Sequence, residues 1–336
     1  MTSYVLRRLL LMIPTLLGIT IVCFTLIQFV PGGPVEQQLS KIRGMNGTRG
    51  GSSVKISQAE VENIKAYCGF DQPAPVRYVK WLGNLLRLDM GKSYSYQKPV
   101  WDVIVSKMPI SLFFGLTSFF LSYLISIPLG VVKAMRNNTK FDTITSLIIF
   151  AGYVMPAYAL GVLLIVFLGG GSFLDWFPIS NMVSDNFESL DPFHKVLDFL
   201  HHMFLPLVCY MVGEFAVLTM LMKNSILEEL NKDYIRTALA KGFSFRQAVW
   251  RQGFRNALIP LATGAGGVLM VMFAGAVLIE RVFDLDGMGL LLYNSINDRD
   301  YNVVLGLIVL QSVLTVLGRL LSDMLYVVVD PRIRFD

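Results

Sequence analysis

Six long apolar runs interrupt the chain, and they constrain its fold more than any other feature of the sequence. A helix needs about 20 predominantly apolar residues to cross the hydrocarbon core of a bilayer. The runs that approach or exceed this length lie near 9–30, 110–132, 144–168, 203–222, 258–279 and 303–329. Hydrophobic residues make up 54% of the 336 residues, and charged residues only 16%. We therefore predict an all-α membrane protein with six transmembrane helices.

Lysine and arginine gather in alternate connections between the runs, which predicts the orientation of the spans. They precede the first run, separate the second from the third and the fourth from the fifth, and follow the sixth. By contrast, segment 169–200 holds one lysine and five acids, and segment 282–302 holds one arginine and four aspartates. Loops longer than about 60 residues cross membranes regardless of charge, so 31–108 is also assigned to the outside. Both termini and 223–257 are then expected in the cytoplasm.

These expectations divide the chain into four parts. Residues 1–30 form the N-terminal cytoplasmic end and a first transmembrane helix that is retained rather than cleaved. Residues 31–108 form an external subdomain, in which RGMNGTRGGSS is a flexible insert and VRYVKWLGNLLRL is a helix along the membrane surface. Residues 109–330 form a five-helix core that carries the cytoplasmic loop 223–257. Residues 331–336 form a cytoplasmic tail.

The segment between the fourth and fifth runs predicts two helices joined at a glycine. Apolar residues at i, i+3 and i+4 from Ile235 indicate one face of a short helix. Gly242 is suited to end that helix, because glycine adopts the left-handed conformation at low cost. Ser244 followed by Gln247 is a capping-box pattern, which begins a second helix. The product is an elbow over 234–246.

Three interpretations of this elbow are open from its residues alone. A solvated loop on the positive side of the membrane requires only the charge. An amphipathic helix on the membrane surface fits poorly, because the basic residues from Arg236 to Arg255 are roughly five positions apart and do not line one face. Small residues at a sharp turn instead favour a knob that enters a groove of another protein, with a basic rim that meets acidic groups.

The elbow and several other stretches resemble one family of membrane proteins. The sequence YIRTALAKGFS…RNALIP resembles the cytoplasmic EAA loop of permease subunits in ATP-binding-cassette (ABC) importers, in the form typical of the dipeptide/oligopeptide group. The stretches GFDQPAPVRYVKWL, LDMGKSY and DMLYVVVDPRIRF are similar to the same group. GGGSFLDWFPISNMVSDNFESLDPFHK is similar to the Yej-type subgroup, which is linked to peptides and to the peptide-nucleotide antibiotic microcin C.

The resemblance implies a type I ABC importer permease in the bacterial inner membrane that imports short peptides or peptide conjugates. Its expected partners are a second homologous permease, two ABC ATPase subunits, an extracytoplasmic peptide-binding protein and membrane lipid. The chain itself is then not an enzyme, and ATP is used by the partner subunits. The resemblance assigns ATPase coupling to Arg236, Thr237, Ala238, Leu239, Ala240, Lys241 and Gly242.

Other patterns that suggest a site are weak. Gly91-Lys92-Ser93 ends like a phosphate-binding loop, but Leu86 stands where the first glycine belongs, so no nucleotide site is expected in this chain. Three histidines, His194, His201 and His202, lack the spacing and companions of a metal site. The net charge of +5 gathers at the ends of apolar runs rather than marking a nucleic-acid protein. We therefore expect no cofactor and no metal in this chain.

Charged residues inside the runs indicate surfaces that avoid lipid. A charge at the centre of a span costs roughly 2.5–3.5 kcal/mol on insertion scales, so Glu214, Glu280 and Arg281 are expected to face protein or water. Glu214 has no basic residue one turn away and is the candidate for the translocation pathway. The alternative function is a secondary transporter or channel for small solutes that acts without an ATPase. It would favour inverted repeats and broken helices, and the sequence shows neither convincingly.

The predicted orientation can be measured with single cysteines. In a variant without native cysteines, Ser52→Cys should react with an impermeant thiol reagent added to intact cells, and Ser244→Cys should react only after the membrane is opened. Labelling of position 244 from outside would reverse the predicted topology.

Overall fold

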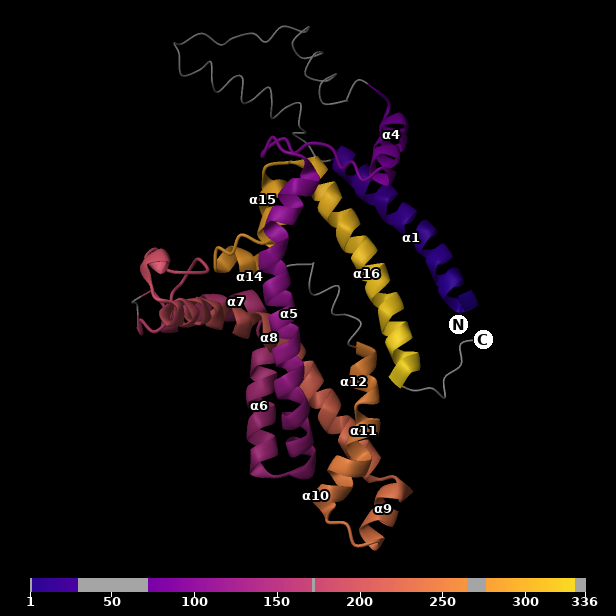
Figure 1. Ribbon diagram of the computed structural model, residues 1–336, viewed down its shortest axis with the longest axis vertical. Helices are drawn as coiled ribbons and strands as arrows, with labels where there is room; N and C mark the ends of the chain where they lie inside the picture. Colours follow the sequence, from indigo (N-terminus) through magenta and orange to yellow (C-terminus); the bar gives the residue numbers. More distant parts are fainter. Residues whose placement is uncertain (1, 30–71, 171–172, 265–275, 330–336) are drawn as a thin grey trace. The chain divides into compact units, whose positions relative to one another are not determined.

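The protein is mostly helical in the part of the chain that its computed structural model describes, residues 2–29, 72–170, 173–264 and 276–329 (Figure 1). Four helices there contain a stretch long and apolar enough to cross a membrane, and a bent pair of helices adds a fifth candidate. The four are α1 (Thr2–Phe29), α5 (Val100–Met135), α8 (Pro192–Leu230) and α16 (Tyr301–Val329). The prediction of a helical membrane protein is thereby confirmed, and the number six is not tested.

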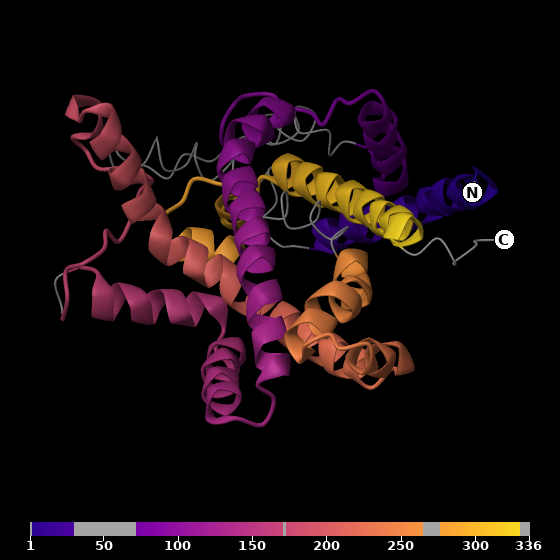
Figure 2. The same ribbon diagram turned by 60° about the horizontal axis from the view of Figure 1, so that its bottom comes forward.

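The third predicted span is not one helix. It is divided into α6 (Lys140–Val154) and α7 (Ala157–Leu168), which are bent by 104° (Figure 2). The cause is local: Pro156 has no N–H to donate, and the residue before a proline is pushed out of the helical region. Met155 accordingly has φ −77° and ψ 127°. The expectation of one span over 144–168 overlooked this pair of residues.

The fifth predicted span falls partly outside the described residues. Its beginning is the short helix α12 (Ile259–Gly264), and its end adjoins α14 (Val277–Val282). The intervening 265–275 lie outside the described part of the chain, as do 30–71 with the predicted insert and the predicted tail. The remaining elements within the described ranges are α4 (Ala74–Leu86), η1 (Phe187–Ser189), α9 (Asp233–Ala240), α10 (Phe245–Ala248), η2 (Val249–Gly253), α11 (Phe254–Ala257) and α15 (Met288–Asn297).

The chain forms two compact units. The first comprises 1–8, 108–290 and 314–336, and the second comprises 9–107 and 291–313. The long helices α5 and α16 each contribute to both.

In the first unit, α5 and α8 pack closely through small residues. A Cβ atom added to Gly130 of α5 would lie 2.6 Å from Cβ of Met222 and 2.8 Å from the carbonyl oxygen of Thr219. Nearby, the Ser126 hydroxyl donates a hydrogen bond of 3.1 Å to the carbonyl of Phe215. Small residues allow two helices to approach this closely. In a membrane, where the hydrophobic effect does not drive helices together, the close van der Waals packing that results stabilises their association. The two helices therefore have a single well-defined register.

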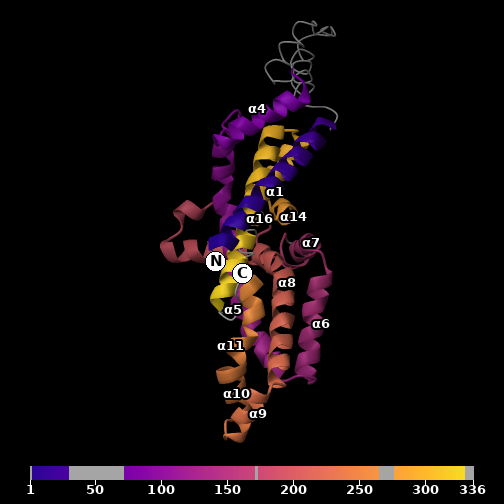
Figure 3. The same cartoon turned by 90° about the vertical axis from the view of Figure 1, so that its right-hand side faces the viewer.

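A buried charged cluster joins α6, which lies beside α8 (Figure 3), to the same pair of helices. The Asp142 carboxylate on α6 lies 3.1 Å from Nζ of Lys133 on α5 and accepts hydrogen bonds of 2.9 and 2.7 Å from Nζ of Lys223 on α8. Lys133 is completely buried and donates also to the hydroxyls of Thr145 and Ser146 at 2.6 and 2.9 Å. One carboxylate thus fixes three helices.

Removal of this carboxylate should destabilise the first unit strongly. Asp142→Asn leaves two lysines without their counter-ion, and an uncompensated buried charge costs about 3–5 kcal/mol. We expect a loss of this size in the free energy of unfolding in detergent. The control is Asp102→Asn, an exposed carboxylate on the first turn of α5, whose interaction with the helix dipole is worth at most about 1 kcal/mol. Equal losses in the two variants would show that the cluster does not hold the helices.

Candidate functional site

The segment that follows α8 folds into the predicted elbow at one end of the first unit (Figure 1). Helix α9 ends before Gly242, whose φ of +90° is in the left-handed region that favours glycine. Helix α10 then begins at Ser244. The capping box is complete, since Oγ of Ser244 accepts from the Gln247 N–H at 3.3 Å and Oε1 of Gln247 accepts from the Ser244 N–H at 3.0 Å. The helix that ends at Gly242 and the helix start at Ser244 are confirmed as the sequence predicted them.

A small apolar core closes the inside of the elbow. Ile235 and Ala238 of α9 and Ala248 of α10 are buried together, with Tyr234 and Phe243 packed against them. The side chain of Ala238 is only 6% exposed. Ala238, one of the residues to which the resemblance assigns ATPase coupling, thus lies inside the elbow, where its small side chain lets α9 and α10 approach each other. Its role in coupling stays a prediction.

The outer face of the elbow is formed by the other predicted residues. They are Arg236, Thr237, Leu239, Ala240, Lys241 and Gly242, and all are exposed. Leu239, with 40% exposure, presents an apolar surface between the basic side chains, and a Cβ added to Gly242 would meet nothing within 4 Å. This face combines small residues, positive charge and one apolar side chain. Such a surface is suited to contact with another protein.

The second half of the elbow departs from a regular α-helix. The sequence predicted one helix from Ser244 towards Pro260, but the chain widens into the π-helix η2 between α10 and α11. Such bulges are often found at functional sites, since they change the direction of the residues that follow. Here the bulge leaves Trp250 partly exposed, with its ring 5.0 Å from that of Phe254.

A polar network fixes α9 to the end of α8 and to α11. The Tyr234 hydroxyl donates to the Glu229 carboxylate and accepts a hydrogen bond of 3.1 Å from Nδ2 of Asn256. Burial, together with the hydrogen bond to the negative carboxylate, raises the pKa of Tyr234 to about 12. The phenol therefore remains a neutral donor at any physiological pH. Sequence periodicity could not find this network, because its three members belong to three different elements.

The base of the elbow enters the main apolar core of the first unit. Val249 of η2, Ala257 of α11 and Leu261 of α12 are buried against Val131 of α5 and Met222 of α8. The Tyr123 hydroxyl of α5 also donates to the Leu261 carbonyl at 3.1 Å. A displacement of α9 would therefore be transmitted to the two long helices through side chains in contact.

Two predicted carboxylates have very different surroundings. Glu280 is fully buried and accepts hydrogen bonds from the hydroxyls of Ser111 and Tyr210, at 2.9 and 3.0 Å, and from the Leu290 N–H at 2.8 Å. It faces protein, as predicted. Glu214 is half-buried on α8, and no hydrogen bond or ion pair joins it to any residue in the described part of the chain. Glu214 is thus still able to interact with a cation from outside this chain.

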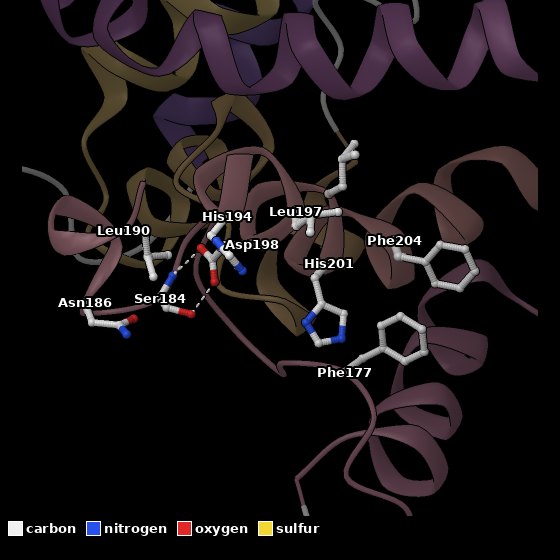
Figure 4. A pocket seen from close by; sticks show the side chains of 10 residues that line it. Phe177, Ser184, Asn186, Leu190, His194, Leu197, Asp198, His201 and Phe204 are labelled. Atoms are coloured by element: carbon white, nitrogen blue, oxygen red, sulfur yellow. Dashed lines mark hydrogen bonds between the residues drawn. The ribbon is translucent and has the colours of Figure 1, made fainter. Parts of the chain in front are cut away.

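A hollow of about 620 Å³ lies beside the first turns of α8 (Figure 4). The rings of Phe177 and Phe204 stack at its edge, 4.9 Å apart. Several of its polar groups already have partners: Ser184 donates to Asp198, and Nε2 of His201 is hydrogen-bonded to the carbonyl of Trp176. Among the described residues no group of three His, Cys, Asp or Glu side chains is placed to hold a metal ion. The hollow therefore has the character of an apolar surface depression rather than a chemical centre.

Comparison with known proteins gives a full-length match. Residues 126–335 match the family described as binding-protein-dependent transport system inner membrane component. The peptidoglycan transport system permease protein YejB of Agrobacterium fabrum is 40% identical over 360 residues, covering 100% of this chain and 99% of the relative. The inner membrane ABC transporter permease protein YejB of Escherichia coli O157:H7 is 39% identical, with 100% of both chains covered. The oligopeptide transport system permease protein AppB of Bacillus subtilis is 36% identical, again over 100% of both. These matches confirm the resemblance to peptide permeases and to their Yej-type subgroup.

The contribution of the Tyr234 hydrogen bonds to the rigidity of the elbow can be measured by amide hydrogen exchange. Tyr234→Phe removes only the hydroxyl group, and a hydrogen bond to a charged group contributes about 1.5–3 kcal/mol. We expect faster amide hydrogen exchange in α9 and unchanged exchange in the centre of α8. Tyr153→Phe is the matched control, because Tyr153 is exposed and lacks a hydrogen-bonded hydroxyl in the described part of the chain. Unchanged exchange in α9 would show that the apolar core alone holds the elbow.

Proposed function

The chain belongs to the family of binding-protein-dependent transport system inner membrane components, and on that premise we propose that it is the transmembrane permease subunit of an ATP-driven importer of short peptides or peptide conjugates. The observation that supports this most is the elbow, whose outer face is exposed while its inner face is packed into the core of the first unit. A solvated loop would need neither the closed core nor the polar network. The chain performs no covalent chemistry in this proposal, requires no cofactor, and leaves ATP to partner subunits.

The outer face of α9 is the proposed docking surface for an ABC ATPase subunit. Leu239 supplies the apolar contact, and Arg236 and Lys241 supply positive charge for acidic groups on the partner. Movement of the ATPase would displace α9 together with Ala248 and Val249, since these residues pack in adjoining cores. Val249 in turn contacts the core formed by α5 and α8. The energy of nucleotide binding and hydrolysis would thus reach the membrane helices mechanically.

The proposal includes the arrangement that the sequence predicted for the membrane. Six spans form a type I importer permease in the bacterial inner membrane, with both termini and 223–257 in the cytoplasm and 31–108 outside. A second homologous permease completes the pathway, two ABC ATPase subunits drive it, and an extracytoplasmic peptide-binding protein delivers the substrate. The names of the relatives support peptides as the substrate class, and microcin C-like conjugates are the narrower form of the same proposal.

Glu214 is the proposed contribution of this chain to the polar lining of the pathway. Its carboxylate is half-buried and has no internal counter-ion in the described part of the chain, and the adjoining Gly213 has open space where a Cβ would stand. A carboxylate in such a position attracts the positive groups of a passing peptide. Tight binding would slow release, so specificity is assigned mainly to the binding protein.

The coupling surface is tested by a substitution that leaves the elbow core intact. Leu239→Asp places a charge where the ATPase would dock, and the loss of a central apolar contact costs about 2 kcal/mol or more. We expect the ATPase subunits to be lost on co-purification and ATP-dependent uptake to fall at least tenfold. Leu174→Asp is the matched control, since Leu174 is 38% exposed against 40% for Leu239 but lies far from the elbow in sequence. Retention of the ATPase by Leu239→Asp would contradict the docking surface.

The transport reaction is tested with the assembled complex in vesicles. Labelled peptide and binding protein are added outside, and uptake is followed with and without ATP. Uptake that requires ATP and all partners supports the importer, whereas equal uptake by this chain alone would favour the secondary transporter or channel. Glu214→Gln should change the uptake of peptides with positive charge more than that of neutral ones. Unchanged uptake of every peptide would remove Glu214 from the pathway.

A further inference from the structure

Helix α4 of the second unit carries an outward face that packing within the unit does not cover. The helix is anchored to α1 through aromatic rings: Tyr78 and Trp81 lie 5.4 and 6.0 Å from the ring of Phe24. The hydroxyls of Thr20 and Tyr78 are hydrogen-bonded at 3.0 Å. Tyr78, Trp81 and Leu85 fall on one side of the helix at its period of 3.6 residues, and this side faces α1.

The outward face is divided lengthwise into an apolar half and a basic half. Val76, Val79 and Leu86 occupy the apolar half and are 44%, 66% and 80% exposed. Lys80 and Arg87 occupy the other half, and both are exposed. Helix α4 contains no acidic residue. The apolar surface of α4 is therefore wider than the part that α1 covers. The charged residues beside its uncovered part, Lys80 and Arg87, are both positive.

We propose that this face of α4 lies in the interface of the lipid bilayer, with Val76, Val79 and Leu86 at the headgroup–acyl boundary and Lys80 and Arg87 on the phosphates of anionic lipids. Helices that lie on membranes have this combination of an apolar sector and a basic edge. Lysine and arginine stems extend along apolar surface and place their charges at the headgroups. Each basic residue close to an anionic membrane adds to the attraction of the helix to the bilayer surface.

Continuity with α1 favours lipid over a protein as the occupant. Residues Leu6–Ile27 of α1 form a candidate span with a mean hydropathy of 2.5, and only 17% of its most apolar stretch is buried within this chain. Most of that apolar surface is therefore uncovered by the rest of the chain. The contacts at Thr20 and Phe24 hold α4 against the last part of that span. The exposed apolar sector of α4 is thereby held beside a candidate membrane span that this chain leaves largely uncovered. This inference is independent of ATPase coupling and of the substrate.

The position of α4 is tested by site-directed spin labelling of the full complex in lipid nanodiscs. Cys23, Cys68 and Cys209 are replaced, and single cysteines are introduced at Val79, on the apolar half, and at Asn84, on the basic side. Val22 of α1 serves as the lipid-facing reference and Asp185 as the aqueous reference. We expect the label at 79 to collide several-fold more with oxygen, which concentrates in lipid, than with an aqueous nickel chelate, and the label at 84 to show the opposite preference.

Two outcomes of this experiment would overturn the proposal. A preference for the nickel chelate at both positions would place α4 in water. Protection of position 79 from both reagents would show that a protein subunit covers this face instead.

A second measurement tests the role of the basic edge. Nanodiscs with and without phosphatidylglycerol are compared for the native helix and for the double variant Lys80→Glu/Arg87→Glu. Anionic lipid should increase the oxygen accessibility at position 79 in the native helix and have no such effect in the double variant. A response that is equal in both, or absent in both, would overturn the assignment of anionic headgroups to Lys80 and Arg87. The apolar contact would then stand or fall by the accessibility at position 79.

Discussion

The Asp142 carboxylate, placed between two lysines, is the interaction on which the first unit depends. An ion pair away from water gains little net energy, because desolvation offsets most of the attraction. Its effect is geometric: the carboxylate can meet Lys133 and Lys223 at the observed distances only when α5, α6 and α8 have one particular register. The close approach at Gly130 imposes the same register by steric means. Two unrelated forces therefore define one arrangement of these helices.

A rigid pair of helices gives the elbow its proposed use. Met222 and Val131 belong to the core into which Val249 packs. Met222 directly precedes Lys223, and Val131 lies two residues before Lys133. The charged cluster and the base of the elbow are thus supported by the same turns of α5 and α8. A displacement of α9 would therefore move α5 and α8 with little deformation of the segment between them. A loop attached only at its two ends would absorb that force by bending.

Much of this architecture could be predicted from the sequence, and the failures have identifiable causes. Gly242, Ser244 and Gln247 specified the elbow because their conformational preferences are local. The apolar pattern that begins at Ile235 placed Ala238 and Leu239 on one face, but it could not say that Ala238 turns inward and Leu239 outward. Pro156 could have indicated a break in the helix, but it stands within a continuous apolar run, and the run was interpreted as one span. The π-helix and the contact of Tyr234 with Glu229 and Asn256 depend on packing between elements, which no periodicity records.

The 104° corner between α6 and α7 has a consequence for the surroundings of the chain. At the end of α6 the last carbonyls have no N–H from a following turn, and Pro156 can supply none. Hydrocarbon offers no hydrogen bonds, so backbone groups left open in this way are not tolerated against acyl chains. Yet Val154, beside the corner, is 79% exposed in the isolated chain. If this part of the chain lies at membrane depth, the corner must border a water-filled space or a neighbouring polypeptide. Lipid acyl chains would then not contact the chain at this position.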